Sequence, residues 1–189
     1  MNIKRISVRQ ILVYGVSAGV LLLARPAWPT FLIGCGIAAM GVAFRVWGCG
    51  HLRKNQQLTT SGPYARVQHP LYLGTFLVSL GAVIAAGSPR FPGVLLWALV
   101  APGFLLVFFG YYLPKKKRVE GGRLAERFGP EFVEYSRVVR PFLPGLRPFR
   151  NASPQRWSWQ AFRANHELGM DLLILALFAA MWVPPRIFP

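Results

Sequence analysis

The sequence predicts an all-α, polytopic membrane protein with about five transmembrane helices and short amphipathic helices on the cytoplasmic side. Hydrophobic residues make up 53% of the 189 residues and charged residues only 15%, a mixture that would leave large apolar patches on a soluble domain. The apolar residues form runs that approach the length of a membrane span. The 22 Lys and Arg residues lie almost entirely between those runs, as they do in cytoplasmic loops.

Five apolar runs define the predicted spans. A helix needs about 20 residues to cross the hydrocarbon, and several runs are shorter or carry Arg9 or Arg45 near an end, so we expect snorkelling or local thinning there. The first run lacks a small-residue cleavage site, and we expect it to stay attached as a helix. Pro102-Gly103, at the centre of the fourth run, predicts a kink or a break. The predicted spans are residues 6–24, 31–49, 71–87, 91–113 and 168–183.

The positive charges predict the orientation of the chain. With the N-terminus inside, nineteen Lys and Arg residues fall on the cytoplasmic side, and only Arg25, Arg90 and Arg186 fall outside. This asymmetry predicts an integral protein of the inner or plasma membrane, with a cytoplasmic N-terminus and an outer C-terminus. Three tryptophans lie where interfacial anchors are expected: Trp28, Trp157 and Trp159.

Two predicted cytoplasmic segments, 51–70 and 115–167, have room for polar chemistry. Apolar residues in the second segment recur with helical spacing, which predicts an amphipathic helix against an apolar surface. Gly129-Pro130 interrupts this stripe and suits the end of one helix and the start of another, so we expect two short helices on the membrane face. No segment is long enough for a second domain, so residues 1–189 form one membrane domain. The stripe comprises Leu124, Phe128, Phe132, Tyr135 and Val139.

The composition argues against two other classes of protein. A net charge of +16 is a first indication of nucleic-acid binding, but the basic residues are divided among apolar runs, so we expect no nucleic-acid partner. Cys35 and Cys49 share one apolar run without metal-ligand spacing, so we interpret them as buried thiols and expect no metal site. Membrane lipids are the expected surroundings, and no obligate protein partner is inferred.

The segment 58–74, between the second and third runs, contains the first candidate site. Pro70 suits the first position of a helix, which places His69 just before that helix and Tyr72 in its first turn. Unpaired backbone N–H groups at the helix start suit a carboxylate or a ribose hydroxyl, and Gly74 leaves room for a flat ring beside the backbone. The alternative from these residues alone is a capped helix start with an interfacial His and Tyr.

Residues 62–74 read GPYARVQHPLYLG and resemble the signature of the isoprenylcysteine carboxyl methyltransferase and phospholipid methyltransferase superfamily. A second block, 120–141, is similar to that family in order and spacing, and Trp159 with Asn165 and Glu167 forms a weaker third similarity. Three positions depart from the family pattern: Gln68 stands in place of Arg, Gly121 in place of a second Glu, and Phe132 in place of Tyr.

The resemblance implies an integral membrane enzyme that uses S-adenosylmethionine. The residue types suit this cofactor, because an aromatic face or a carboxylate stabilises a positively charged sulfonium. Methyl transfer needs mainly alignment of the reacting atoms and exclusion of water. The residues that the resemblance assigns to the cofactor pocket are Tyr64, His69, Pro70, Tyr72, Leu73, Gly74 and Glu120.

The resemblance also implies a lipophilic small-molecule or prenylated substrate, with isoprenylcysteine carboxyl O-methylation as the most similar reaction. Arg140 is the predicted catalytic partner of an acceptor carboxylate through a bidentate fork. Glu134 is predicted to orient Arg140 or to accept a proton from an amine. From the residues alone, Arg140 equally suits a basic cytoplasmic loop and Glu134 a solvated helix face. A lipid amine or another small hydrophobic acceptor, and a non-catalytic membrane component on the same scaffold, are the alternatives.

Overall fold

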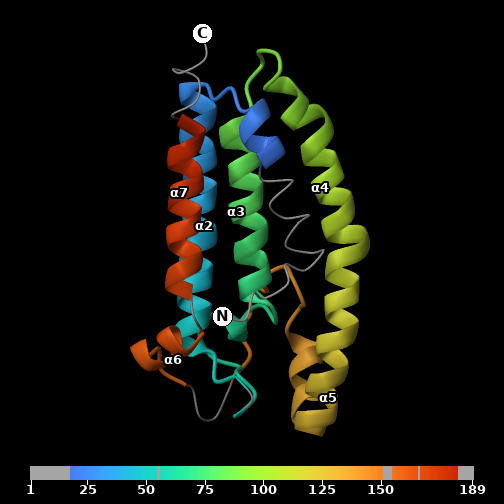
Figure 1. Cartoon of the computed structure of the whole chain (residues 1–189). Helices are drawn as coiled ribbons and strands as arrows, with labels where there is room; N and C mark the ends of the chain where they lie inside the picture. Colours follow the sequence, from blue (N-terminus) through green and yellow to red (C-terminus); the bar gives the residue numbers. More distant parts are fainter. Residues whose placement is uncertain (1–17, 55, 151–154, 166, 183–189) are drawn as a thin grey trace, which may run out of the picture.

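The computed structural model describes residues 18–54, 56–150, 155–165 and 167–182, and this part of the chain contains helices but no strand. The predicted all-α class is therefore confirmed. Helices α2 (Trp28–His51), α3 (Pro70–Ala86) and α7 (Glu167–Trp182) stand side by side, and a longer helix labelled α4 and α5 runs along the other side of α3 (Figure 1). The short helix α6 (Trp159–Ala164), the loop after α2 and the end of α5 lie at one end of the molecule (Figure 1).

Helices α2 and α3 approach closely because glycines face each other across their interface. A methyl group at Gly34 would overlap the backbone of Gly81, and a methyl group at Gly41 would overlap the backbone of Gly74. Between these two contacts the residue number rises by seven along α2, from Gly34 to Gly41, and falls by seven along α3, from Gly81 to Gly74. The two helices are therefore antiparallel. Such spacing is typical of left-handed packing at a small crossing angle, and small residues at the contact suit helix packing within a membrane.

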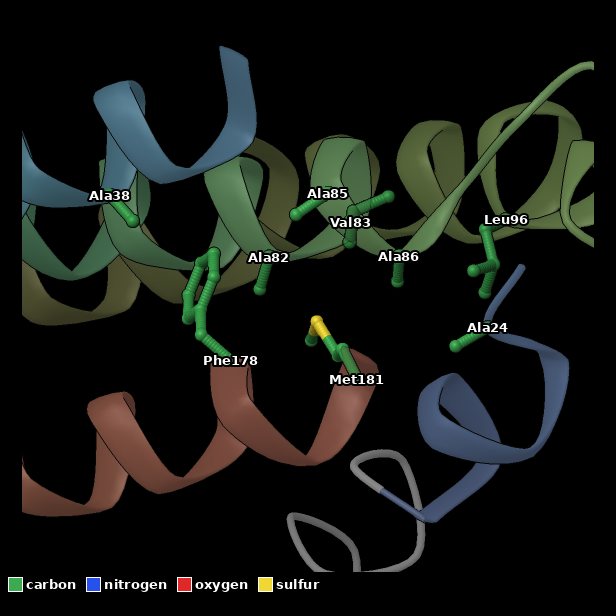
Figure 2. Packing of buried hydrophobic residues seen from close by; sticks show 9 residues of the cluster. All are labelled: Ala24, Ala38, Ala82, Val83, Ala85, Ala86, Leu96, Phe178 and Met181. Carbon is green, nitrogen blue, oxygen red and sulfur yellow. The ribbon is translucent and has the colours of Figure 1, made fainter. Parts of the chain in front are cut away.

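Helix α7 completes the core near the start of α2 and the end of α3. Met181 is fully buried and Phe178 nearly so, and Figure 2 shows both side chains pointing from α7 toward alanines of α3. Because alanine leaves space above the helix backbone, the two large side chains of α7 fill it. The other residues of this cluster are Ala24, Ala38, Ala82, Val83, Ala85, Ala86 and Leu96.

The fourth predicted span belongs to a helix that does not end near residue 113. Two π-helical turns, Leu96–Val100 and Phe108–Tyr112, flank α4 (Ala101–Val107), and the helix continues as α5 (Leu113–Val138). Residue 113 is the end of the apolar run, and as the end of a membrane span it stays a prediction. The helix itself continues because the basic residues that follow the apolar run are good helix formers. The apolar span therefore passes directly into the amphipathic helix.

The prediction of a kink or a break at Pro102-Gly103 is corrected as to the break, since the helix runs through it, and the kink stays a prediction. Pro102 follows one π-helical turn by two residues, and Pro114 follows the other in the same way. In each turn a backbone N–H bonds to the carbonyl five residues earlier, from Ala101 to Leu96 in the first case. This wider turn accommodates a proline ring that would collide with the carbonyl four residues earlier in a regular helix.

The predicted break at Gly129-Pro130 is confirmed. Gly129 has φ 52° and ψ −128° inside α5, a backbone conformation that residues with a Cβ rarely adopt. The stretch after it turns Phe132 and Tyr135 onto Leu58 of the loop that follows α2. The end of α5 therefore covers that loop.

Two helices, Trp28–His51 and Leu96–Val138, are long and apolar enough to cross a membrane. Helices α3 and α7 correspond to two further predicted spans but have 17 and 16 residues, and the first predicted span, 6–24, lies mostly outside the described residues. Two candidate spans are thus shown, and the five-span arrangement stays a prediction. Large apolar side chains are exposed along the outer faces of α2 and α4: Leu32, Ile33, Met40, Trp47, Leu105, Leu106 and Val107.

Candidate functional site

The start of α3 is where the two sequence blocks meet. His69 precedes the helix and Pro70 occupies its first turn, as predicted. The His69 backbone N–H donates to the carbonyl of Pro141 (3.1 Å), and the Gln68 N–H donates to the carbonyl of Arg140 (3.0 Å). Val67 and Arg140 form a parallel β-bridge at the same point. The chain that follows α5 is therefore held against the segment that begins α3.

Side chains from the two blocks also meet, at Glu120 of α5. The hydroxyl of Tyr72 donates to the Glu120 carboxylate, and His69 Nδ1 lies 3.8 Å from the other carboxylate oxygen. Burial lowers the pKa of His69, and the nearby Glu120 charge, which favours the protonated form, does not reverse that effect. The imidazole is therefore neutral at pH 7 and faces Glu120 as an uncharged ring.

A lysine ammonium lies on the same carboxylate. Lys116 Nζ is 3.4 Å from Glu120 Oε1, 5.5 Å from the centroid of the Tyr72 ring and 6.0 Å from that of the Tyr112 ring. Both separations are within the range of cation–π attraction. One carboxylate and two tyrosine faces thus surround one position that suits a cation.

A cavity of about 580 Å³ opens beside this group, a volume typical of pockets for small molecules. One wall is the loop after α2, with residues 52–54 and 57–59, and the opposite wall is the face of α5 between Glu120 and Tyr135. Tyr64 and the residues 68–72 form the end. The lining combines apolar and aromatic side chains with Arg, Lys, Glu, Gln and Thr, so the cavity suits a ligand with both apolar and polar parts.

The loop wall is held in place by contacts that the sequence explains locally. Gly62 has φ 58° and lies against the ring of His51, where a Cβ would collide with the imidazole. The Tyr135 hydroxyl donates to the carbonyl of Tyr64 (2.8 Å) and is almost completely buried. Leu58 packs into the apolar cluster of α5. These contacts fix Tyr64 at the cavity wall.

Comparison with known proteins shows the family of this chain. Residues 15–121, more than half of the chain, match the family described as phospholipid methyltransferase. The chain belongs to the phospholipid methyltransferase family. The matched region contains α2, α3, α4 and Glu120, so it includes both partners of the Tyr72–Glu120 hydrogen bond.

Two curated relatives of this phospholipid methyltransferase family member are named for metal resistance. The cobalt-zinc-cadmium resistance protein CzcN of Cupriavidus metallidurans is 32% identical over 136 residues, which are 71% of this chain and 56% of the relative. The nickel-cobalt-cadmium resistance protein NccN of Alcaligenes xylosoxydans xylosoxydans is 31% identical over 165 residues, which are 81% of this chain and 70% of the relative. The chain thus spans little more than half the length of the first relative. No solved structure matches the chain.

The segment 155–165, which lies beyond the region that matches the phospholipid methyltransferase family, is also in contact with the site. Trp157 Nε1 donates to the carbonyl of Val46 (3.2 Å), and the Asn165 amide donates to the carbonyl of Cys49 (3.2 Å). The Cys49 carbonyl lies in the last turn of α2, where carbonyls lack a helical partner, and Asn165 satisfies it. Arg53, which lines the cavity, donates to the Ser158 hydroxyl (3.1 Å). We call residues 155–165 the strap.

The weaker similarity at Trp159 and Asn165 pointed to the strap but not to its contacts, because its partners lie about 100 residues earlier in the chain. Trp157 was predicted as an interfacial anchor, but its indole instead packs against Gly50 and Phe162. Trp28 and Trp159 do have exposed side chains, as an anchor requires.

The predicted cofactor residues divide into two groups in this phospholipid methyltransferase family member. Leu73 packs with Phe108 and Phe142 away from the cavity. Gly74 faces α2, where the stem of Arg45 and the backbone of Gly41 occupy the space of a side chain, so no ring can approach there. Five predicted residues line the cavity: Tyr64, His69, Pro70, Tyr72 and Glu120.

The two predicted catalytic residues lie outside the lining of this cavity. The side chains of Arg140 and Glu134 are both exposed, and the Arg140 backbone is engaged in the β-bridge with Val67. Within the described part of the chain, no ion pair joins Glu134 to Arg140. Their roles stay predictions.

Proposed function

We propose that this protein is an S-adenosylmethionine-dependent methyltransferase that acts on a lipophilic acceptor at the membrane. The family supports the reaction class, since its methyltransferases generally use this cofactor. The observation that carries the proposal is the hydrogen bond from Tyr72 to Glu120 beside a cavity of about 580 Å³. It joins the two blocks that resemble the family signature, and it does so where a ligand fits.

The residues around the cavity fit the cofactor. S-adenosylmethionine, when bound, supplies an electrophilic methyl group on a positively charged sulfur. Glu120, Tyr72 and Tyr112 provide a carboxylate and two ring faces for a cationic group. Tyr64 and Gln68 add polar groups along the cavity. Residues of α5 form part of the cavity lining, so the chain contributes alignment of the reacting groups rather than a covalent partner.

We propose that the chain is integral to the inner or plasma membrane, with the N-terminus in the cytoplasm. The two candidate spans and the exposed apolar faces of α2 and α4 support membrane insertion. The cavity is lined by residues from the start of α3 and from α5, which are at one end of the helices (Figure 1). A cavity at that level is accessible to a lipophilic acceptor that moves within the bilayer.

For the acceptor we propose a carboxylate such as that of an isoprenylcysteine. Arg123 and Arg127 line the cavity, and they are better placed than Arg140 to pair with an acidic acceptor. A carboxylate nucleophile requires no base. A lipid amine is the alternative acceptor, and in that case the amine must lose a proton before or during transfer.

A second candidate function follows from the names of the two relatives. Both are called resistance proteins for metal ions, so the chain is proposed as a membrane component of such a resistance system, either through its methylated product or without catalysis. Among the described residues, no group of three or more His, Cys, Asp and Glu side chains could hold a metal ion. We therefore favour the methylation reading over direct metal binding.

The test is transfer of labelled methyl groups by the detergent-purified protein. Wild-type protein with labelled S-adenosylmethionine should label a lipid extract or an S-farnesyl cysteine compound, and Glu120→Gln should lose most of that transfer. Release of the label by mild base identifies an ester, whereas a base-stable product identifies a methylated amine. If the protein neither binds S-adenosylmethionine in calorimetry nor transfers label, the enzymatic proposal is wrong. Survival on toxic metal ions with Glu120→Gln then tests the non-catalytic candidate.

A further inference from the structure

The ammonium of Lys116 makes the contacts that a positively charged group of the methyl donor would make. Its ammonium lies 3.4 Å from Glu120 and faces the rings of Tyr72 and Tyr112. A carboxylate combined with aromatic faces is a typical arrangement for binding ammonium and sulfonium groups. The same carboxylate accepts the hydrogen bond from Tyr72 and lines the cavity.

An ordinary helix-surface ion pair would explain part of this arrangement. Lys116 and Glu120 are four residues apart on α5, and their side chains are 37% and 30% exposed. Such pairs contribute little, and a lysine placed before the glutamate is the weaker order, because it opposes the helix dipole. Tyr72 belongs to a different helix, however, and its ring faces the ammonium across the gap between α3 and α5. A surface pair does not need that ring.

We propose that Glu120, Tyr72 and Tyr112 form a cation site, and that Lys116 occupies it until a cationic group of the methyl donor takes its place. The inference rests on the proposed function, because it concerns the same cavity. Weak pairing suits the role, since an occupant that leaves easily costs the ligand little affinity. The long side chain of Lys116 can turn to solvent, where an ammonium is well hydrated.

The experiment compares ligand binding by Lys116→Met and by the matched control Lys117→Met. Lys117 is the next residue of α5 and its side chain is exposed, so its replacement removes the same charge without emptying the site. Calorimetry on the full-length protein in detergent measures the Kd for S-adenosylmethionine and for S-adenosylhomocysteine, whose sulfur is uncharged. Thermal unfolding confirms that both variants are folded, and Lys116→Gln serves as a second variant if Lys116→Met is not.

Lys116→Met should bind S-adenosylmethionine about threefold to tenfold more tightly than wild type, the effect expected for removing a weak ion pair and two cation–π contacts. Lys117→Met should change the Kd less than twofold. A gain restricted to S-adenosylmethionine means that the site takes the sulfonium, whereas an equal gain for both ligands means that it takes the amino group that they share.

Unchanged or weaker binding by Lys116→Met overturns the inference, because the lysine would then be a bystander or a direct ligand. That result leaves the proposed function intact as long as wild type binds. Absence of binding by wild type and by both variants overturns the proposed function as well, so the two failures are distinguishable.

Discussion

The packing of the strap against α2 can be tested by adding a single methyl group at Gly50. In the structure, a Cβ at this position would overlap the Trp157 indole. The variant Gly50→Ala must therefore displace Trp157, which breaks its hydrogen bond to the carbonyl of Val46 and separates it from Phe162. Overpacking lowers the free energy of unfolding by about 1–3 kcal/mol, and the lost hydrogen bond lowers it by about 1 kcal/mol. The higher helix propensity of alanine raises it by about 0.5–1 kcal/mol.

The expected net effect of Gly50→Ala is a destabilisation of about 1–3 kcal/mol, which for a chain of this size lowers Tm by several degrees. Thermal unfolding in detergent measures it, with Gly122→Ala as the matched control. Gly122 lies inside α5 with nothing near an added Cβ, so that variant should be slightly more stable than wild type. Affinity for S-adenosylmethionine should also fall in Gly50→Ala, because Arg53 of the cavity wall is bonded to the strap.

A Tm for Gly50→Ala at or above that of wild type would refute this reasoning, since it would mean that Trp157 does not pack against α2. A lower Tm with unchanged cofactor affinity would refute only the link between the strap and the cavity.

Three further changes have definite expected results. Gly129→Ala forces a side chain into a backbone conformation with φ 52° and should destabilise by about 1–3 kcal/mol in thermal unfolding, unlike Gly122→Ala. Tyr135→Phe leaves the buried carbonyl of Tyr64 without its donor and should cost about 1–3 kcal/mol, whereas Tyr111→Phe at an exposed position should cost little; equal effects would contradict the assignment. Burial lowers the pKa of His69, so the unfolded chain binds its proton first as the pH falls below about 6.5. Stability should therefore decline from that pH downward, and His69→Gln should show a smaller decline between pH 7 and 5.5 if the residue is buried as described.

Local rules predicted the features that depend on neighbouring residues. Pro70 placed the start of α3 after His69, and Gly129-Pro130 placed the break in α5, because proline and glycine restrict or extend the backbone wherever they occur. The continuous helix through Pro102 was not predictable in this way. Its two prolines are accommodated by π-helical turns, which have no simple sequence signal.

Contacts between segments that are distant in the chain were harder to predict from the sequence. The meeting of Tyr72 with Glu120 was expected only from the resemblance to a family, because it depends on where α5 crosses the start of α3. Gly74 was interpreted as a place for a ligand ring, but in the structure it allows the close approach of α2. A glycine permits close contact with a ligand ring or with another helix, and the sequence does not specify which of the two occurs. The contacts of the strap were not predicted for the same reason, since its partners on α2 lie far away in the chain.

The central claim is that the cavity between the start of α3 and α5 is the site of methyl transfer. An experimental structure of the detergent-purified protein with bound S-adenosylhomocysteine tests it most directly. We expect the ligand in the cavity, in contact with Tyr64 and His69, with its sulfur or amino group at the position between Glu120 and Tyr72. A ligand bound elsewhere, with Glu120 still paired to Lys116, would contradict it.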